Sequence, residues 1–260
     1  MKNCFEKLGA PAPSVFLYEE TDSTNTRAKE YARAHSENNR PALFIADSQT
    51  AGRGRLGRSF HSEKGVGIYL SLLLYPTDRG ADATRLTARA AVALARAVEE
   101  ASGLSPDIKW VNDLYSNGKK LAGILAECEM NSDGKIAYLV LGMGINVYKT
   151  TYPEEISAIA TSIESECGVR IKKEELVART VNELLSKEHE DVFVEYSERL
   201  ITRGDITVRK HTGESYPARV IELLPDYSLL IERENGEREK LFTGEVSTSV
   251  KRSKSAEDNR

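Results

Sequence analysis

The sequence predicts an α+β protein in which a large mixed domain is followed by a small β-rich module. Three consecutive β-compatible runs joined by short turns are typical of an antiparallel meander, and helical periodicity follows over 154–200. From Gly204 to Val250 the chain instead alternates short strands with turn residues. A chain of 260 residues, 40% of them hydrophobic, is long enough for both units. We therefore expect domains over 1–203 and 204–250, with 251–260 as a flexible tail.

The amino-terminal region is predicted to combine two strands with one helix. The apolar runs VFLYEE (15–20) and PALFIADSQ (41–49) both have the composition of strands. Between them, capping residues precede good helix formers, so a helix should begin near Asp22 or Ser23.

Two buried elements follow. The run VGIYLSLLLYP (66–76) is too uniformly apolar for one of its faces to meet water, so we expect a central strand. From Asp82 to Ala101, leucine and alanine recur at helical spacing, and Gly103 should end this helix. The pattern favours a helix that faces the core.

The meander is the clearest local prediction. Asn117-Gly118 lies between two β-compatible runs and is the dipeptide that best adopts the two positive φ angles of a type I′ hairpin turn. NSDG (131–134) marks a second turn, and KIAYLVLGMGINV (135–147) is the third strand. Asn235-Gly236 is a further hairpin signal in the carboxy-terminal module.

Charge and cysteine content exclude several classes of function. The chain has 36 basic and 40 acidic residues, a net charge of −4, which gives no overall field for binding nucleic acid or an anionic membrane. Its three cysteines are an odd number without CxxC spacing, so neither a disulfide framework nor a thiolate metal site is indicated. No signal peptide or membrane span is recognisable. We expect a soluble, cytoplasmic protein that binds anions only locally.

The segment GRGRLGR (52–58) is a local anion site by composition. Glycines bring backbone N–H groups close to a ligand, and arginines match phosphate and carboxylate oxygens. The spacing fits neither a Walker A loop nor a GxGxxG motif. Contact with RNA and a solvated surface are the alternatives that composition leaves open. Because the segment occurs once, between two apolar strands, a small-molecule site is favoured.

Three further segments carry candidate side chains. Ser23, Thr24 and Asn25 cluster at a helix start, where they can bind a polar ring; a plain N-cap is the alternative and explains one of the three. Asp113 and Lys120, on the arms KWVND and KKLAG of the predicted hairpin, can face each other, and the alternative is an exposed ion pair.

The strand LGMGIN (141–146) holds two glycines at otherwise buried positions. They either relieve crowding or let a ligand lie against the backbone. Asn146 follows them with an amide suited to a base edge.

The chain carries, in this order, the motifs STN, QTAGRGRLGR, KWVNDL with KKLAGIL, GMGIN and a β module with TGEVS. Over about residues 15–250, this ordered set resembles the biotin protein ligases. The resemblance implies a catalytic domain of the class II aminoacyl-tRNA-synthetase and biotin-ligase type, with a mixed sheet flanked by helices, and a small SH3-like barrel. It implies a ligase that joins biotin to ATP, releases pyrophosphate, and passes biotin from biotinyl-5′-adenylate to a lysine of a biotin carboxyl carrier domain. Lipoate ligases and octanoyl transferases share this fold, but the GRGRLGR and KLAGIL segments point away from them.

The resemblance also implies roles for individual residues. The implied biotin-binding residues are Ser23, Thr24, Asn25, Gln49, Arg53, Gly54, Arg55, Lys120 and Gly123. The implied ATP-binding residues are Arg53, Arg55, Arg58, Phe60, Asn112, Lys120 and Asn146. Lys120, Asp113 and Arg55 are the implied catalytic residues. Mg²⁺ is expected to arrive with ATP, held by phosphate oxygens and water, so we expect no dedicated metal site.

The chain departs from the family pattern at three places. Val111 replaces the usual proline of KWPND, and Phe60 stands where a tryptophan commonly shields the adenine. Only 14 residues precede Val15, which leaves no room for the amino-terminal DNA-binding domain of some members. We therefore expect a short form without DNA binding or membrane contact, acting as a monomer or homodimer.

Overall fold

The computed structural model describes residues 8–9, 12–35, 37, 39–75, 83–186, 190–210, 212–242 and 245–248. The chain divides into two compact units, Met1–Ile201 and Thr202–Arg260. The predicted tail 251–260 and the predicted helix start at Asp82 lie outside the described residues.

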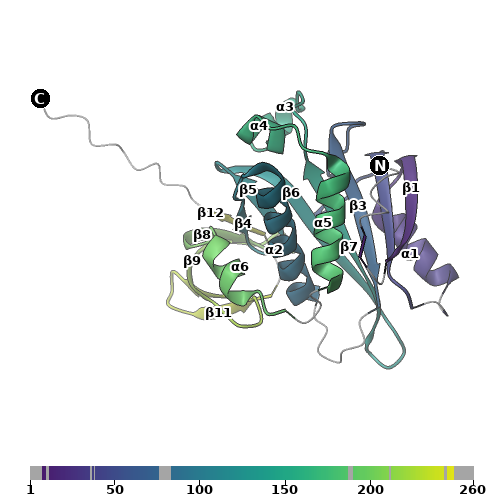
Figure 1. The fold of residues 1–260 in the computed structure, drawn as a ribbon. Coiled ribbons are helices and arrows are strands. Elements are labelled where there is room, and N and C mark those ends of the chain that lie inside the picture. Colours follow the sequence, from purple (N-terminus) through teal and green to yellow (C-terminus); the bar gives the residue numbers. More distant parts are fainter. Residues whose placement is uncertain are drawn as a thin grey trace, which may run out of the picture. The chain divides into compact units, whose positions relative to one another are not determined.

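The first unit is built on a seven-stranded mixed sheet in the order β1-β2-β3-β7-β6-β5-β4 (Figure 1). β1 and β2 are parallel, and the other neighbours are antiparallel. The predicted central strand is confirmed, since β3 has neighbours on both sides and is buried on both faces. The strands are β1 (Ser14–Thr21), β2 (Ala42–Gln49), β3 (Gly67–Leu74), β4 (Asp107–Lys109), β5 (Asp113–Ser116), β6 (Lys119–Met130) and β7 (Ile136–Asn146).

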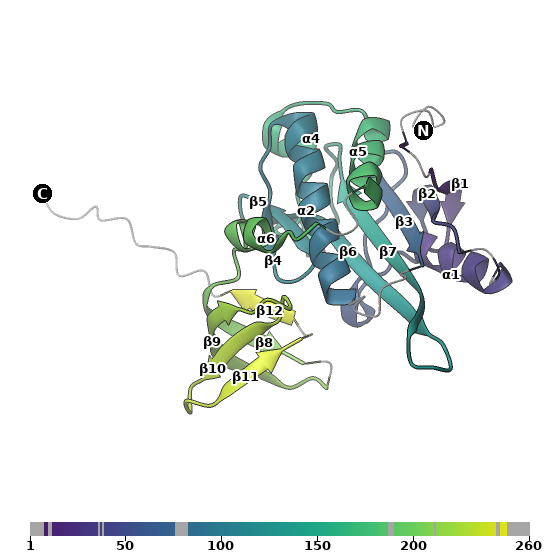
Figure 2. The same ribbon diagram turned by 60° about the horizontal axis from the view of Figure 1, so that its bottom comes forward.

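Helices cover both faces of this sheet. α2 (Ala83–Ser102) and α5 (Lys173–Ser186) lie side by side over one face (Figures 1 and 2). α1 (Thr24–Ala34) packs on the other face, where Ala28 lies in a cluster with Phe44, Leu73 and Val140. Because side chains alternate along a strand, the sheet positions between these residues face α2 and α5. The remaining helices are α3 (Glu154–Ser157), α4 (Ile163–Cys167) and α6 (Phe193–Arg199).

The meander confirms one local prediction and corrects another. Asn117 and Gly118 have φ values of 48° and 75°, as a type I′ turn requires. The predicted arm 109–113 is not one strand, because residues 110–112 form a turn between β4 and β5 in which the Trp110–Val111 peptide bond is cis. A register shift between Leu114 and Tyr115 then interrupts the pairing of β5 with β6.

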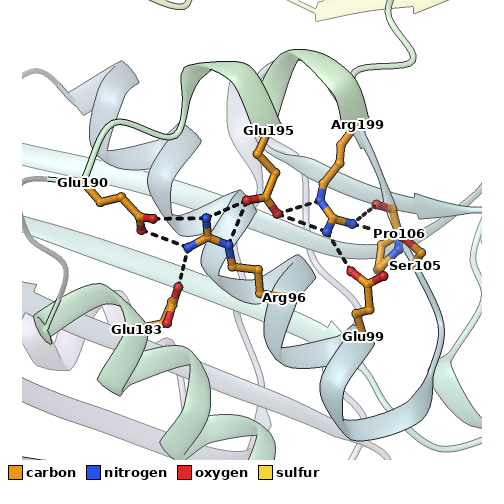
Figure 3. Close-up of polar contacts among 8 residues, drawn as sticks. All are labelled: Arg96, Glu99, Ser105, Pro106, Glu183, Glu190, Glu195 and Arg199. Carbon is orange, nitrogen blue, oxygen red and sulfur yellow. Dashed lines mark hydrogen bonds and ion pairs between the residues drawn. The ribbon is translucent and has the colours of Figure 1, made fainter.

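Two arginines join three helices of the first unit, α2, α5 and α6, into one charge network (Figure 3). Arg96 of α2 binds Glu183 of α5, Glu190, and Glu195 of α6. Arg199 of α6 binds Glu195 and Glu99 of α2, and it donates to Ser105. Hydrogen bonds to Glu190, and then to Glu195 and Glu183, raise the pKa of Arg96 above its ordinary value. This Arg96–Arg199 network ties α2, α5 and α6 together.

The second unit contains a five-stranded antiparallel sheet in the order β11-β10-β9-β8-β12. Among the described strands, β11 and β12 are edges that do not pair with each other, so the sheet is open. Gly236 has φ 82° and donates its N–H to the carbonyl of Arg233, but Asn235 does not adopt positive φ, so this hairpin lacks the type I′ turn. The strands are β8 (Gly204–Arg209), β9 (Ser215–Leu223), β10 (Leu229–Arg233), β11 (Arg238–Leu241) and β12 (Glu245–Thr248).

Candidate active site

The sheet face that α1 covers continues beyond α1 as a strip of small and polar residues. Ser71 of β3 pairs with Gly142 of β7, and two residues further along, Gly144 pairs with Gly123 of β6. Gly123 in turn pairs with Asp113 of β5. Since residues directly opposite each other, and those two apart, share one face, the strip runs without interruption from Ser71 to Asp113.

The glycines of this strip let side chains lie flat on the backbone. A Cβ at Gly142 would overlap the amide of Asn25, and one at Gly144 would come within 2.5 Å of the Phe60 ring. A Cβ at Gly123 would lie 3.0 Å from Nζ of Lys120. Relief of crowding therefore accounts for both glycines of LGMGIN, and it brings three predicted site residues onto one surface.

Buried hydrogen-bonding groups gather at the α1 end of the strip. The Thr24 N–H and hydroxyl donate to Oε1 of Gln49 at 2.9 and 3.2 Å. The Ser71 hydroxyl lies 2.5 Å from Oδ1 of Asn25 and 2.7 Å from the Thr24 hydroxyl. Nε2 of Gln49 donates to the hydroxyl of Ser62 at 3.0 Å. Three predicted biotin-binding residues thus share one polar cluster, with both serines added to it.

Ser23 occupies the N-cap of α1, but its side chain makes no capping hydrogen bond. The residue is buried, and its backbone N–H donates to Asp22 Oδ1 at 2.6 Å. A plain N-cap therefore does not explain why this serine is buried here.

The opposite end of the strip carries charge. Nζ of Lys120 lies 2.8 Å from Oδ2 of Asp113, and their side chains are 31% and 21% exposed. This confirms that the two residues face each other, as a partly exposed ion pair. Oδ1 of Asp113 is buried and has no hydrogen-bond partner within the part of the chain that the structure describes. A buried carboxylate oxygen in this state is suited to accept a hydrogen bond from a ligand.

The GRGRLGR loop connects the two ends. It folds around the short 3₁₀ turn Arg55–Gly57, closed by hydrogen bonds from the Gly54 N–H to the Arg58 carbonyl and from the Phe60 N–H to the Gly52 carbonyl. Arg53 donates to the Thr26 hydroxyl on α1. Arg55 donates to Oδ1 of Asn112, in the turn before β5, at 3.1 Å. The loop thus contacts both α1 and the turn before β5.

Of the remaining predicted residues, Asn146 and Asn112 contact β6 near the charged end. Nδ2 of Asn146 is 3.5 Å from the backbone carbonyl of Lys120, and Nδ2 of Asn112 donates to the carbonyl of Ile124 at 2.7 Å. The Phe60 ring meets the Tyr69 ring edge-on, with centroids 6.4 Å apart. The Arg58 side chain is exposed at the loop surface.

Sequence reasoning missed three residues of this site. Ser71 is the single polar residue in the run GIYLSLLL, a signal that could have identified it. Ser62 links Gln49 to the Phe60 carbonyl, and no motif marks it. Glu127, which follows KLAGIL after one residue, accepts hydrogen bonds from Asn25 and Lys29 of α1.

The described part of the first unit also has a hollow outside the strip. A groove of about 550 Å³ beside α6 is bordered by Arg96 and Arg199, whose charges are already compensated by the network of Figure 3. Within the described ranges, no group of three or more His, Cys, Asp or Glu side chains could hold a metal ion. No helix among the described residues is long and apolar enough to span a membrane.

The chain belongs to the biotin/lipoate A/B protein ligase family, whose model matches residues 17–146. The matched segment contains every site residue predicted from the sequence.

Individual relatives agree with this family. The chain is 40% identical over 163 residues to the bifunctional ligase/repressor BirA of Bacillus subtilis, covering 61% of this chain and 49% of that protein. It is 34% identical over 162 residues to the biotin–(acetyl-CoA-carboxylase) ligase of Paracoccus denitrificans, covering 60% and 65%. The structure is similar to that of the Aquifex aeolicus biotin protein ligase in complex with biotin and ATP. The TM-score is 0.73 at 27% identity, covering 90% of this chain and 97% of that one. The chain thus spans about half the length of the Bacillus protein.

Proposed function

We propose that this protein activates biotin with MgATP, forming biotinyl-5′-adenylate and pyrophosphate, and then transfers the biotinyl group to a lysine of a biotin carboxyl carrier domain. The observation that carries this proposal is the glycine strip with a neutral polar cluster at one end and the Lys120–Asp113 pair at the other. Ser71 on β3 and Gly123 on β6 are separated by β7 and by a shift of two residues along the strands. This places them roughly 12 Å apart. An elongated ligand with a polar head and a terminal carboxylate fits this arrangement.

The polar cluster favours biotin over lipoate. The ureido ring of biotin has two N–H donors and a carbonyl acceptor, and in our proposal Ser23, Thr24, Asn25 and Gln49 bind it. The dithiolane ring of lipoate would leave these buried groups without ligand partners, so lipoate should bind much more weakly than biotin. Two of the similar proteins support the same choice, since the Paracoccus and Aquifex proteins are both called biotin ligases.

Adenylation brings together two anions, the biotin carboxylate and the α-phosphate of ATP. A lone pair of a carboxylate oxygen attacks the α-phosphorus, and the bond from that phosphorus to the α,β-bridging oxygen breaks, so that pyrophosphate leaves with the bonding electrons. We propose that Lys120, Arg53 and Arg55 neutralise both reactants, because the approach is otherwise opposed by their charges. Gly54 and Gly123 would then lie against biotin, and Arg58, Phe60, Asn112 and Asn146 on the nucleotide side. Mg²⁺ would arrive bound to ATP.

Transfer requires the acceptor lysine to lose a proton. We propose that Asp113 accepts this proton, because its buried Oδ1 is without a partner among the described residues and lies beside Gly123. The neutral amine then attacks the carbonyl of the mixed anhydride, and AMP leaves with the bonding electrons. No covalent intermediate on the protein is needed.

The domain plan of the family supports further parts of the proposal. We propose that the first unit is the biotin- and ATP-binding domain and that the second is an SH3-like module. The thiols of Cys128 and Cys167 are free, which suits a reducing cytoplasm.

The test mixes the purified protein with biotin, MgATP and a carrier domain, and follows the mass of the carrier. We expect one biotinyl group per carrier and none on a carrier whose target lysine is replaced by arginine. Lipoate in place of biotin should give no product. Labelling with lipoate but not with biotin would replace this proposal with lipoate ligation.

A further inference from the structure

Glu127 of β6 contacts two residues on one side of α1. Its Oε2 accepts a hydrogen bond from Nδ2 of Asn25 at 2.8 Å, and its Oε1 accepts one from Nζ of Lys29 at 2.7 Å. The side chain is only 27% exposed. Burial by itself would raise the pKa of Glu127, but the hydrogen bonds from Lys29 and Asn25 outweigh it and hold the pKa below its ordinary value. Glu127 is therefore an anion at neutral pH.

An ionised carboxylate only accepts hydrogen bonds, so it determines which way the Asn25 amide faces. The NH₂ group must point to Glu127, and Oδ1 must then point to the Ser71 hydroxyl. Ser71 alone would not impose this, because a hydroxyl pairs with either end of an amide.

The other end of the polar cluster is fixed independently. The backbone N–H of Thr24 donates to Oε1 of Gln49, which leaves Nε2 of Gln49 to donate to Ser62. A backbone N–H is always a donor, so this amide also has one orientation. The donors and acceptors between Glu127 and Ser62 are therefore determined at both ends.

We propose that Glu127 is a positioning residue that fixes the Asn25 amide and so sets the hydrogen-bond pattern offered to the ureido head of biotin. This inference rests on the proposed function and names a determinant of its ligand specificity. Lys29 compensates the charge of Glu127, so the carboxylate orients Asn25 without presenting an uncompensated anion to the ligand.

The test measures two dissociation constants by calorimetry, biotin without ATP and ATP without biotin. Glu127→Gln keeps the shape of the side chain but can donate as well as accept, so the Asn25 amide is no longer held in one orientation. Loss of one oriented hydrogen bond should raise the Kd for biotin about tenfold. The Kd for ATP should stay within about twofold, since Asn25 lies at the opposite end of the strip from Lys120, Asn112 and Asn146.

Glu129→Gln is the matched control. Glu129 lies two residues further along β6 and also pairs with α1, through Arg33 at 3.4 Å, but it is not bonded to Asn25. Both dissociation constants should match the parent protein. An unchanged biotin Kd in Glu127→Gln would overturn the inference, and so would a parallel rise in both constants, which indicates a general structural role. Failure of the parent protein to bind biotin would instead refute the proposed function.

Discussion

The Arg96–Arg199 network and the Lys120–Asp113 pair are both assemblies of charged side chains in the first unit, but they are organised differently. Arg96 binds three carboxylates from three parts of the chain, with Glu195 at 2.6 Å and Glu190 at 2.9 Å. Lys120 binds one carboxylate, Asp113, on its own hairpin. In the first assembly, several carboxylates of the protein compensate each cation. In the second, the Lys120 ammonium lies against the backbone of Gly123, where a side chain would be in the way.

The carboxylates differ in the same way. Glu195 is shared between Arg96 and Arg199, so both of its oxygens are used (Figure 3). Asp113 uses Oδ2 for Lys120, and its buried Oδ1 has no partner among the described residues. A network whose charged groups all bind one another stabilises the packing of helices. A pair in which a carboxylate oxygen lacks a partner can instead bind a ligand. This difference predicts that mutations in the two assemblies have separable effects.

The largest effect is expected for Lys120→Ala. Removing the charge-assisted contact that we propose between Lys120, the biotin carboxylate and the α-phosphate should lower the rate of adenylate formation by about 100-fold or more. Tm should change little, because the lysine is partly exposed and its partner lies on the same hairpin. Pyrophosphate release measures the first quantity and calorimetry the second. Pyrophosphate release at the parent rate would contradict the role of Lys120.

The reverse pattern is expected for Arg96→Met. Loss of the guanidinium leaves Glu183, Glu190 and Glu195 close together without their shared cation. The free energy of unfolding should fall by about 2 kcal/mol, which lowers Tm by about 6 °C, while the rate of adenylate formation at 25 °C stays at the parent value. A large loss of adenylation without loss of Tm would show that the network is not purely structural.

A smaller effect is expected for Arg55→Gly. The arginine holds the GRGRLGR loop against Asn112 at 3.1 Å, so its removal should let the loop open and release the reactive adenylate. Biotinylation of a bystander protein should rise about tenfold over the parent protein, an effect of about 1.4 kcal/mol on loop closure. Streptavidin blotting after incubation with a non-carrier protein measures it. Bystander labelling no higher than that of the parent would refute loop closure by Arg55.

The smallest effect is expected in the second unit, which has a closed charge network of its own. Glu239 binds Lys210 at 2.9 Å and Arg233 at 2.6 Å. Burial would raise the pKa of Glu239, but hydrogen bonds from Lys210 and Arg233 outweigh it and lower the pKa to about 2. A lowered pKa means that the stabilisation is present above the unfolded-state pKa of about 4.3 and is lost as pH falls toward 2.

Amide hydrogen exchange in β9–β11 should therefore become less protected between pH 4.3 and 2, and Glu239→Gln should flatten this dependence. Thr207 of β8 is exposed and takes no part in the ion pairs of Glu239, so Thr207→Ser serves as a surface control in the same sheet. An unchanged pH dependence in Glu239→Gln would show that the carboxylate does not contribute.

Sequence reasoning predicted the parts of the fold that depend on local rules. Asn117-Gly118 defines its turn through backbone φ preferences, and the apolar run of β3 requires burial on both faces. The contact between Lys120 and Asp113 follows from the same hairpin. The turn at 110–112 was missed because the run around it is compatible with a strand, and only pairing of Lys109 with Asp113 reveals the reversal.

The residues that sequence reasoning missed depend on contacts between distant segments. Ser71 reaches Asn25 only because α1 packs over β3, and Glu127 reaches Asn25 across 102 positions of the chain. No periodicity or spacing encodes such a contact. The motifs indicated the chemistry of the site, but the shared polar cluster became visible only with the register of β3, β7 and β6.

The most direct test of the account is the isolation of the adenylate. The parent protein, Lys120→Ala and Arg96→Met are each incubated with biotin and α-³²P-labelled MgATP without a carrier, and biotinyl-5′-AMP is measured by chromatography. We expect adenylate from the parent protein and from Arg96→Met, and about 100-fold less from Lys120→Ala. Equal adenylate from Lys120→Ala, or its loss in Arg96→Met while the protein stays folded, would contradict the distinction between the two charge assemblies.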